Sequence, residues 1–155
     1  HSNPESEIEM TKLFINAASL VLAAAFFGCG SDSTEPSGAP VGSYGAFEWV
    51  TTGTSGQTNQ LAIGSTLQIT LASDGSTIGH LHTAASGGNP AFDADMAGTW
   101  TMSGNVVQFH QNADTFVRNM DFVLQPIATG AWDLIGDETF PGGRVQLTLR
   151  HGAIL

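Results

Sequence analysis

The chain of 155 residues is long enough for one domain of ordinary size. Fourteen acidic side chains stand against four basic ones, and the formal charge of -10 excludes a protein that binds nucleic-acid backbones through clustered positive charge. Only 12% of the residues are charged and 41% are hydrophobic, which excludes a charge-rich disordered chain. The single cysteine excludes an intramolecular disulfide and a cysteine-cluster zinc site.

The first predicted element is an apolar run at residues 13–27, which is shorter than the ~18 residues expected of a membrane-spanning helix. Lys12 precedes this run and the small residue Gly28 follows it, so residues 10–28 have the pattern of a secretory signal peptide. We interpret residues 1–9, which carry three glutamates, as upstream residues from read-through or cloning. The alternative is that the run forms a buried helix.

The end of the apolar run carries a resemblance to a known family. The sequence Ala-Phe-Phe-Gly-Cys at residues 25–29 resembles the lipobox of bacterial lipoproteins. The resemblance implies that the signal is cleaved before Cys29, that this cysteine is lipidated, and that the protein is held in the cell envelope. Gly30 follows the cysteine, where Asp would signal retention in the inner membrane, so we expect the outer membrane, facing the periplasm. In the alternative of a buried helix, Cys29 would be an ordinary core thiol.

The segment that follows, residues 29–40, is polar and rich in proline, glycine and serine, which indicates a flexible tether. Beyond it, residues 41–155 show no amphipathic pattern of helical length. Short alternating runs are separated instead by Gly, Asn and Asp, which is typical of strands joined by tight turns. The predicted strands are residues 43–51, 66–72, 76–83, 97–102, 106–111, 114–125, 131–136 and 144–150.

These strands follow one another with short connections, so we predict an all-β fold, an up-and-down antiparallel barrel of about eight strands. Closing the sheet removes the exposed edges that long strands would present, and a barrel of this size has a mostly filled interior. The alternative is a β-sandwich of immunoglobulin type, although the chain lacks the Cys-Trp-Cys spacing of that family.

The turn sequences are similar to those of lipocalin-like domains on bacterial lipoproteins. The matching segments are Gly42-Ser43-Tyr44, residues 71–75, and Gly98-Thr99-Trp100 before residues 103–105. This resemblance implies a barrel that holds a small apolar ligand, and it brings no catalytic residues with it.

The predicted strand 114–125 contains the candidate ligand contacts. Alternation places Arg118 on one face with Phe116, Met120 and Phe122. If that face is the interior, the guanidinium must be paired, by Glu48 or Asp133, or must orient a ligand carboxylate. The alternative is that Arg118 lies near a strand end and extends its head into solvent.

The tryptophans add one further candidate contact. Trp100 is a further candidate ligand contact. The alternative is that it is a core residue, as tryptophans more often are.

Two histidines suggest a metal site. His80 and His82 are two residues apart on a predicted strand, so both point to one face, and His110 or the pair Asp93 and Asp95 could complete a copper or zinc shell. The alternative is a solvated polar face. Asp93 and Asp95 could also act as a general acid and base, but no nucleophile or oxyanion donor lies nearby, so we interpret them as solvated acidic residues.

The sequence therefore predicts a monomeric, lipid-anchored envelope barrel that binds a small hydrophobic or amphipathic ligand. The alternatives are a packed structural or interaction module of the envelope, or a metal-handling lipoprotein that uses His80 and His82. We expect no enzymatic activity, no cofactor and no nucleic-acid partner, and the membrane contact is expected to come from the lipid.

Overall fold

A computed structural model describes residues 40–127 and 131–153. The predicted signal peptide, Cys29 and nearly all of the tether lie outside the described residues. Over the described ranges, no helix has the length and apolar character needed to cross a membrane. These ranges contain strands and two short 3-10 helices, which confirms the predicted all-β class.

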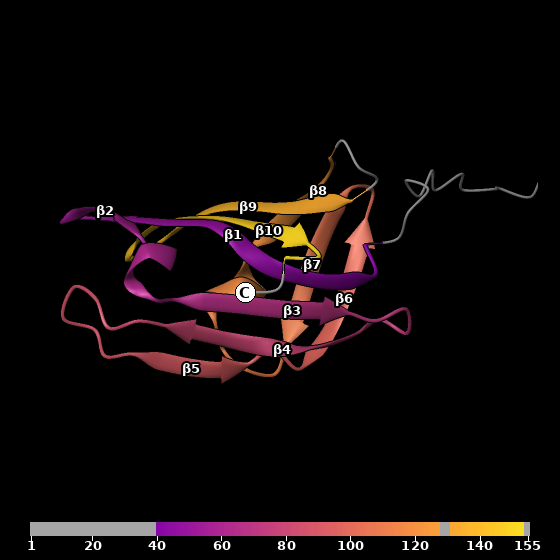
Figure 1. The fold of residues 1–155 in the computed structure, drawn as a ribbon, viewed down its shortest axis with the longest axis horizontal. Coiled ribbons are helices and arrows are strands. Elements are labelled where there is room, and N and C mark those ends of the chain that lie inside the picture. Colours follow the sequence, from indigo (N-terminus) through magenta and orange to yellow (C-terminus); the bar gives the residue numbers. More distant parts are fainter. Residues whose placement is uncertain (1–39, 128–130, 154–155) are drawn as a thin grey trace, which may run out of the picture. The chain divides into compact units, whose positions relative to one another are not determined.

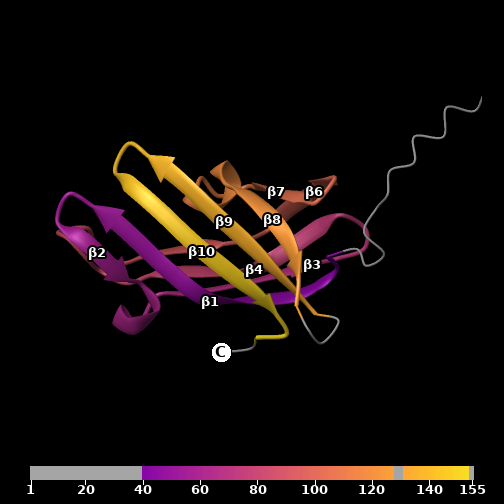
Figure 2. The same ribbon diagram turned by 90° about the horizontal axis from the view of Figure 1, so that it is seen from above.

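Eight strands form a closed antiparallel barrel (Figures 1 and 2). In order around the barrel they are β1 (Gly42–Gly53), β3 (Thr66–Leu71), β4 (Ser76–Thr83), β6 (Gly98–Ser103), β7 (Val106–Gln111), β8 (Asp121–Pro126), β9 (Trp132–Phe140) and β10 (Gly143–His151). The last strand closes the ring by pairing with the first, from Tyr44 opposite His151 to Thr52 opposite Arg144. The barrel prediction is confirmed, and the sandwich alternative is wrong.

Two four-residue strands lie beside the ring and were not predicted. The first, β2 (Gly56–Asn59), folds back on the end of β1, and the 3-10 helix η1 (Leu61–Ile63) follows it. The second, β5 (Phe92–Asp95), pairs with β4 in the same register that β6 keeps with that strand. Short strands of this kind have too few residues for an alternating pattern to stand out.

The predicted strand 114–125 is wrong in its first half. A 3-10 helix, η2 (Phe116–Asn119), precedes β8 and ends with the backbone N–H of Met120 donating to the carbonyl oxygen of Val117 at 3.4 Å. The preceding strand β7 ends at Gln111, and it pairs with β8 only over the first three residues of β8. A strand beginning at residue 114 would lack that partner, so the chain turns into η2 and buries Val117 instead.

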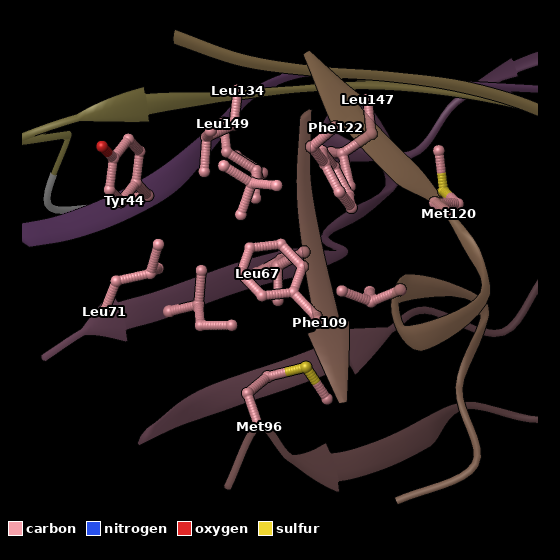
Figure 3. Close-up of a cluster of buried hydrophobic side chains, with 14 of the residues drawn as sticks. Tyr44, Leu67, Leu71, Met96, Phe109, Met120, Phe122, Leu134, Leu147 and Leu149 are labelled. Carbon is pink, nitrogen blue, oxygen red and sulfur yellow. The ribbon is translucent and has the colours of Figure 1, made fainter. Parts of the chain in front are cut away.

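Apolar side chains fill the barrel interior, and Figure 3 shows a cluster of them that includes Leu67, Phe109 and Phe122. On β3 the buried residues are Leu67, Ile69 and Leu71, the set that alternation predicts to share a face. The rings of Phe109 and Phe122 meet edge to face with centroids 5.1 Å apart. Each fully buried side chain of this size contributes about 1.5–3 kcal/mol, so the filled interior stabilises the closed barrel.

A glycine makes room for this packing. Gly136 on β9 lies opposite Phe122 on β8, and a Cβ added there would come within 2.7 Å of the Met120 methyl carbon and 2.9 Å of the Phe122 ring. The absence of a side chain at this position therefore lets the core side chains of β8 and its neighbour Met120 pack against the β9 backbone.

Candidate functional site

The outer wall of the barrel carries a cluster of two histidines and two aspartates on β4 and β5. His80 and His82 both point outward because Leu81 between them is buried in the core, so the prediction that they share a face is confirmed. The pairing of the strands places Asp95 opposite His80 and Asp93 opposite His82. Residues that are 11 to 13 positions apart in the chain thus meet on one surface.

One carboxylate oxygen joins the two imidazoles. Asp93 Oδ1 lies 2.8 Å from His82 Nδ1 and 3.0 Å from His80 Nε2. The other ring nitrogen of His80, Nδ1, lies 3.7 Å from Asp95 Oδ1. The hydrogen bonds from His82 and then His80 lower the pKa of Asp93 from its usual value, so this carboxylate is charged at neutral pH.

His110 belongs to a different part of the wall. It lies on β7, where its Nε2 is 3.1 Å from Thr101 Oγ1 on β6. Of the two candidate completions of the histidine pair, the fold therefore brings together the aspartates and leaves His110 apart. With the side chains as they stand, no three His, Cys, Asp or Glu in the described ranges form a ready-made metal shell.

Most of the predicted ligand contacts are core residues. Met120 and Phe122 are fully buried, and the Trp100 indole N–H donates to the carbonyl oxygen of Ala72 at 2.9 Å, which ties β6 to the turn between β3 and β4. The interior is packed around these side chains, so they contact other core groups.

Of the two possibilities for Arg118, an interior position and a solvent-exposed head, the structure shows the exposed one. Arg118 lies on η2 with 41% of its side chain exposed, 3.7 Å from the Asp114 carboxylate. The expected partner Asp133 binds Arg150 instead, through two hydrogen bonds of 2.9 and 3.1 Å, and Glu48 is exposed. The alternation that grouped Arg118 with Phe116 fails because these residues form a 3-10 turn rather than a strand.

The remaining candidate, Phe116, lines a cleft at one end of the barrel. The cleft has a volume of about 460 Å³ and lies where the turn between β1 and β2, the loop at residues 84–90 and the turn between β9 and β10 meet. Phe116 and Phe140 supply aromatic rings to its wall. Hydroxyl and amide side chains supply most of the rest, among them Thr51, Thr54, Thr58, Gln60, Ser86 and Asn89.

A chain of hydrogen bonds holds one wall of this cleft in place. The Gln60 amide donates to Thr51 Oγ1 at 2.8 Å and accepts from Ser65 Oγ at 3.0 Å. The same Ser65 oxygen accepts the backbone N–H of Ala84 at 2.9 Å. The network links β1, the start of β3 and the loop at residues 84–90, so it holds this wall of the cleft in position. Sequence reasoning missed it because its residues come from turns with no periodic pattern.

Three residues near η2 have buried polar groups. Gln111 at the end of β7 is 3% exposed and Thr115 before η2 is 6% exposed, yet neither the Gln111 amide nor Thr115 Oγ1 has a hydrogen-bond partner among the described residues. The indole nitrogen of Trp49, whose ring packs on Phe116, also has no hydrogen-bond partner among the described residues.

A second, smaller hollow of about 320 Å³ lies on the outer face of β1, β3 and β4. Its wall includes Ser43, Thr70, Ile78 and His80, so it borders the histidine–aspartate cluster. Ile78 is 66% exposed, the largest exposed fraction of any bulky apolar residue in the described ranges.

Comparisons of the chain with protein-family models, with curated proteins and with solved structures return no match.

Proposed function

We propose that the protein is a lipid-anchored β-barrel of the cell envelope that binds a small amphipathic molecule in the cleft between the β1–β2 and β9–β10 turns. The cleft is the observation that carries this proposal. Its volume of about 460 Å³ falls within the ~300–1,000 Å³ of small-molecule sites, whereas the barrel interior is filled by its own side chains. The ligand site is therefore at the mouth of the barrel, in contrast to a lipocalin-like interior site.

The lining of the cleft favours a neutral ligand with both polar and apolar faces. Threonine and serine hydroxyls and the amides of Gln60 and Asn89 can donate and accept hydrogen bonds, and the rings of Phe116 and Phe140 can cover an apolar face. Arg144 is the charged residue of the wall, and its guanidinium is bound to the Asp137 carboxylate. An anionic ligand would have to compete with that carboxylate.

The cell-envelope part of the proposal depends on Cys29 and on charge. Lys12 is the sole lysine of the chain, and it lies in the predicted signal, so the tether and barrel carry many more carboxylates than arginines. An acidic domain gains nothing from anionic lipid headgroups, so attachment would come from acyl chains on Cys29. Labelling cells with a palmitate analogue tests this: the label should appear on the wild type and be lost in Cys29→Ser. An unlabelled wild-type protein would reject the lipoprotein assignment.

The cleft is tested with the full chain purified from its own membrane and analysed by native mass spectrometry. We expect a bound small molecule that is lost in Phe140→Ala, which removes a ring of the cleft wall. The matched control is Val123→Ala, an exposed apolar residue on β8 outside the cleft. Equal occupancy in both variants, or no bound molecule in the wild type, would favour the packed interaction module instead.

A further inference from the structure

We infer that His80, His82 and Asp93 form a binding site for one divalent transition-metal ion on the outer wall of the barrel, with Asp95 as the residue that orients His80. The site lies on β4 and β5, and none of its four residues lines the cleft, so the inference does not rest on the proposed ligand.

Both histidines approach the same oxygen of Asp93 at distances close to those between the ligands of a small metal ion. A tetrahedral zinc ion with ligands at ~2.0–2.1 Å holds neighbouring donors about 3.3 Å apart. The two imidazole nitrogens now lie 2.8 and 3.0 Å from Asp93 Oδ1, at hydrogen-bond distance. Both nitrogens face the same carboxylate oxygen, so an ion would take the place of the protons between these atoms by rotation of three side chains that are 34–58% exposed.

The fourth side chain is placed where an outer-shell partner of a metal-bound histidine is expected. A ligating histidine usually donates its second ring N–H to a carboxylate, which fixes the tautomer. Asp95 Oδ1 lies 3.7 Å from His80 Nδ1, and its side chain is 88% exposed and free to close this distance. A proton held on Nδ1 leaves the Nε2 lone pair, which faces Asp93, available to the metal.

The strands hold the ligands in fixed positions. The antiparallel pairing of β4 and β5 sets His80 opposite Asp95 and His82 opposite Asp93. The two histidines are two residues apart on β4, and the two aspartates are two residues apart on β5. Sites built on paired strands are more precise than sites on loops. All three arginines of the described chain bind other carboxylates, those of Asp114, Asp133 and Asp137, so none of them occupies the site.

The donor set indicates the class of metal. Two imidazoles and one carboxylate suit zinc or copper, whereas calcium and magnesium prefer oxygen ligands. With three protein ligands, a fourth position remains open to solvent, beside the 320 Å³ hollow that His80 borders. The site would therefore bind the ion with an exchangeable fourth ligand.

Isothermal titration of the full chain in mild detergent, after chelator treatment, tests the inference with zinc and copper salts. All variants carry Cys29→Ser, so that this thiol does not bind the metal. We expect one ion per chain, and no binding of calcium. Loss of an outer-shell partner costs ~10–100-fold in affinity, so His82→Ala and Asp93→Ala should each lose at least about tenfold. Asp95→Ala should lose roughly tenfold and keep the stoichiometry.

The matched control is His110→Ala, which removes an exposed histidine of β7 and should leave the affinity unchanged. Electron paramagnetic resonance of the copper form should show two coupled nitrogens, and one in His82→Ala. Thermal midpoints measured without metal show that the variants are folded. Equal affinity in His82→Ala and the wild type, an equal loss in His110→Ala, or no binding to the folded wild type would overturn the inference.

Discussion

The indole ring of Trp49 packs against the phenyl ring of Phe116, with ring centroids 5.5 Å apart and planes inclined at 42°. Trp49 belongs to β1 and is buried in the core, whereas Phe116 belongs to η2 and also lines the cleft. The contact therefore connects the packing of the barrel to the position of the cleft wall, and a change at Phe116 should affect both.

Replacing Phe116 with Ala should lower the free energy of unfolding by about 2 kcal/mol, less than the ~3–5 kcal/mol of a fully buried phenylalanine, because Phe116 is only partly buried. The lost aromatic pair accounts for ~0.5–1.5 kcal/mol of this. Chemical denaturation measures the change. Phe92→Ala, at a 49% exposed position on β5, is the control and should change stability by less than about 0.5 kcal/mol. A stability loss in Phe116→Ala no larger than in this control would contradict the packing described.

Gly136→Ala should destabilise the barrel by about 1–3 kcal/mol, because the new methyl group would meet the Met120 methyl and the Phe122 ring below 3 Å. Gly142→Ala is the matched control, since a Cβ at that turn position meets nothing within 4 Å. The thermal midpoints of the two variants should differ clearly. Equal thermal midpoints for Gly136→Ala and Gly142→Ala would mean that the interior beside Gly136 has room for a methyl group, contrary to the packing described.

Tyr44 should ionise late, and its signal can be read directly because the chain contains one tyrosine. Burial, with a smaller contribution from the Asp133 charge, raises the pKa of Tyr44 from 10 to about 12. A raised pKa means that the folded state keeps the proton longer. The resulting stability is complete below pH 10 and is lost as the pH rises towards 12. Tyrosinate absorbance should therefore rise near pH 12 or on alkaline unfolding, and a midpoint near 10 in folded protein would show an accessible hydroxyl.

The ion pairs on β9 and β10 should differ in their effect on stability. Asp133 is 8% exposed at its side chain and binds Arg150, whose guanidinium also lies 3.5 Å from the Phe47 ring centroid. Asp133→Asn weakens a part-buried pair, since Arg150 is 34% exposed, and should cost about 1–3 kcal/mol. Asp137→Asn, at the exposed partner of Arg144, should cost at most about 1 kcal/mol. Urea denaturation of both variants measures the difference, and equal losses would contradict this ranking.

The barrel could be predicted because each strand has one face towards the core, so apolar residues recur at every second position of its sequence. The predicted bounds of β4 and β7 match those observed, and the apolar face of Leu67, Ile69 and Leu71 is the buried one. The segment around Arg118 alternates equally well but lacks a partner strand. Whether a partner strand is present depends on the lengths and register of the neighbouring strands, which the local sequence does not reveal.

The sites were predictable to different degrees. His80 and His82 share a face because of their spacing alone, but their contact with Asp93 depends on the register of β4 with β5, which the sequence does not state. The cleft is made by turns and loops that come together only when the barrel closes. Lipidation of Cys29 stays a prediction, since that residue lies outside the described part of the chain.

The pairing of β10 with β1 joins segments about a hundred residues apart, from Tyr44 with His151 to Thr52 with Arg144. Such a contact requires closure of a long loop, which slows folding, and it cannot form until the final strand is available. A chain still emerging from the ribosome would therefore stay open until residues 143–151 arrive. Ring closure would then be the last step of folding, whatever the order in which the other strands pair.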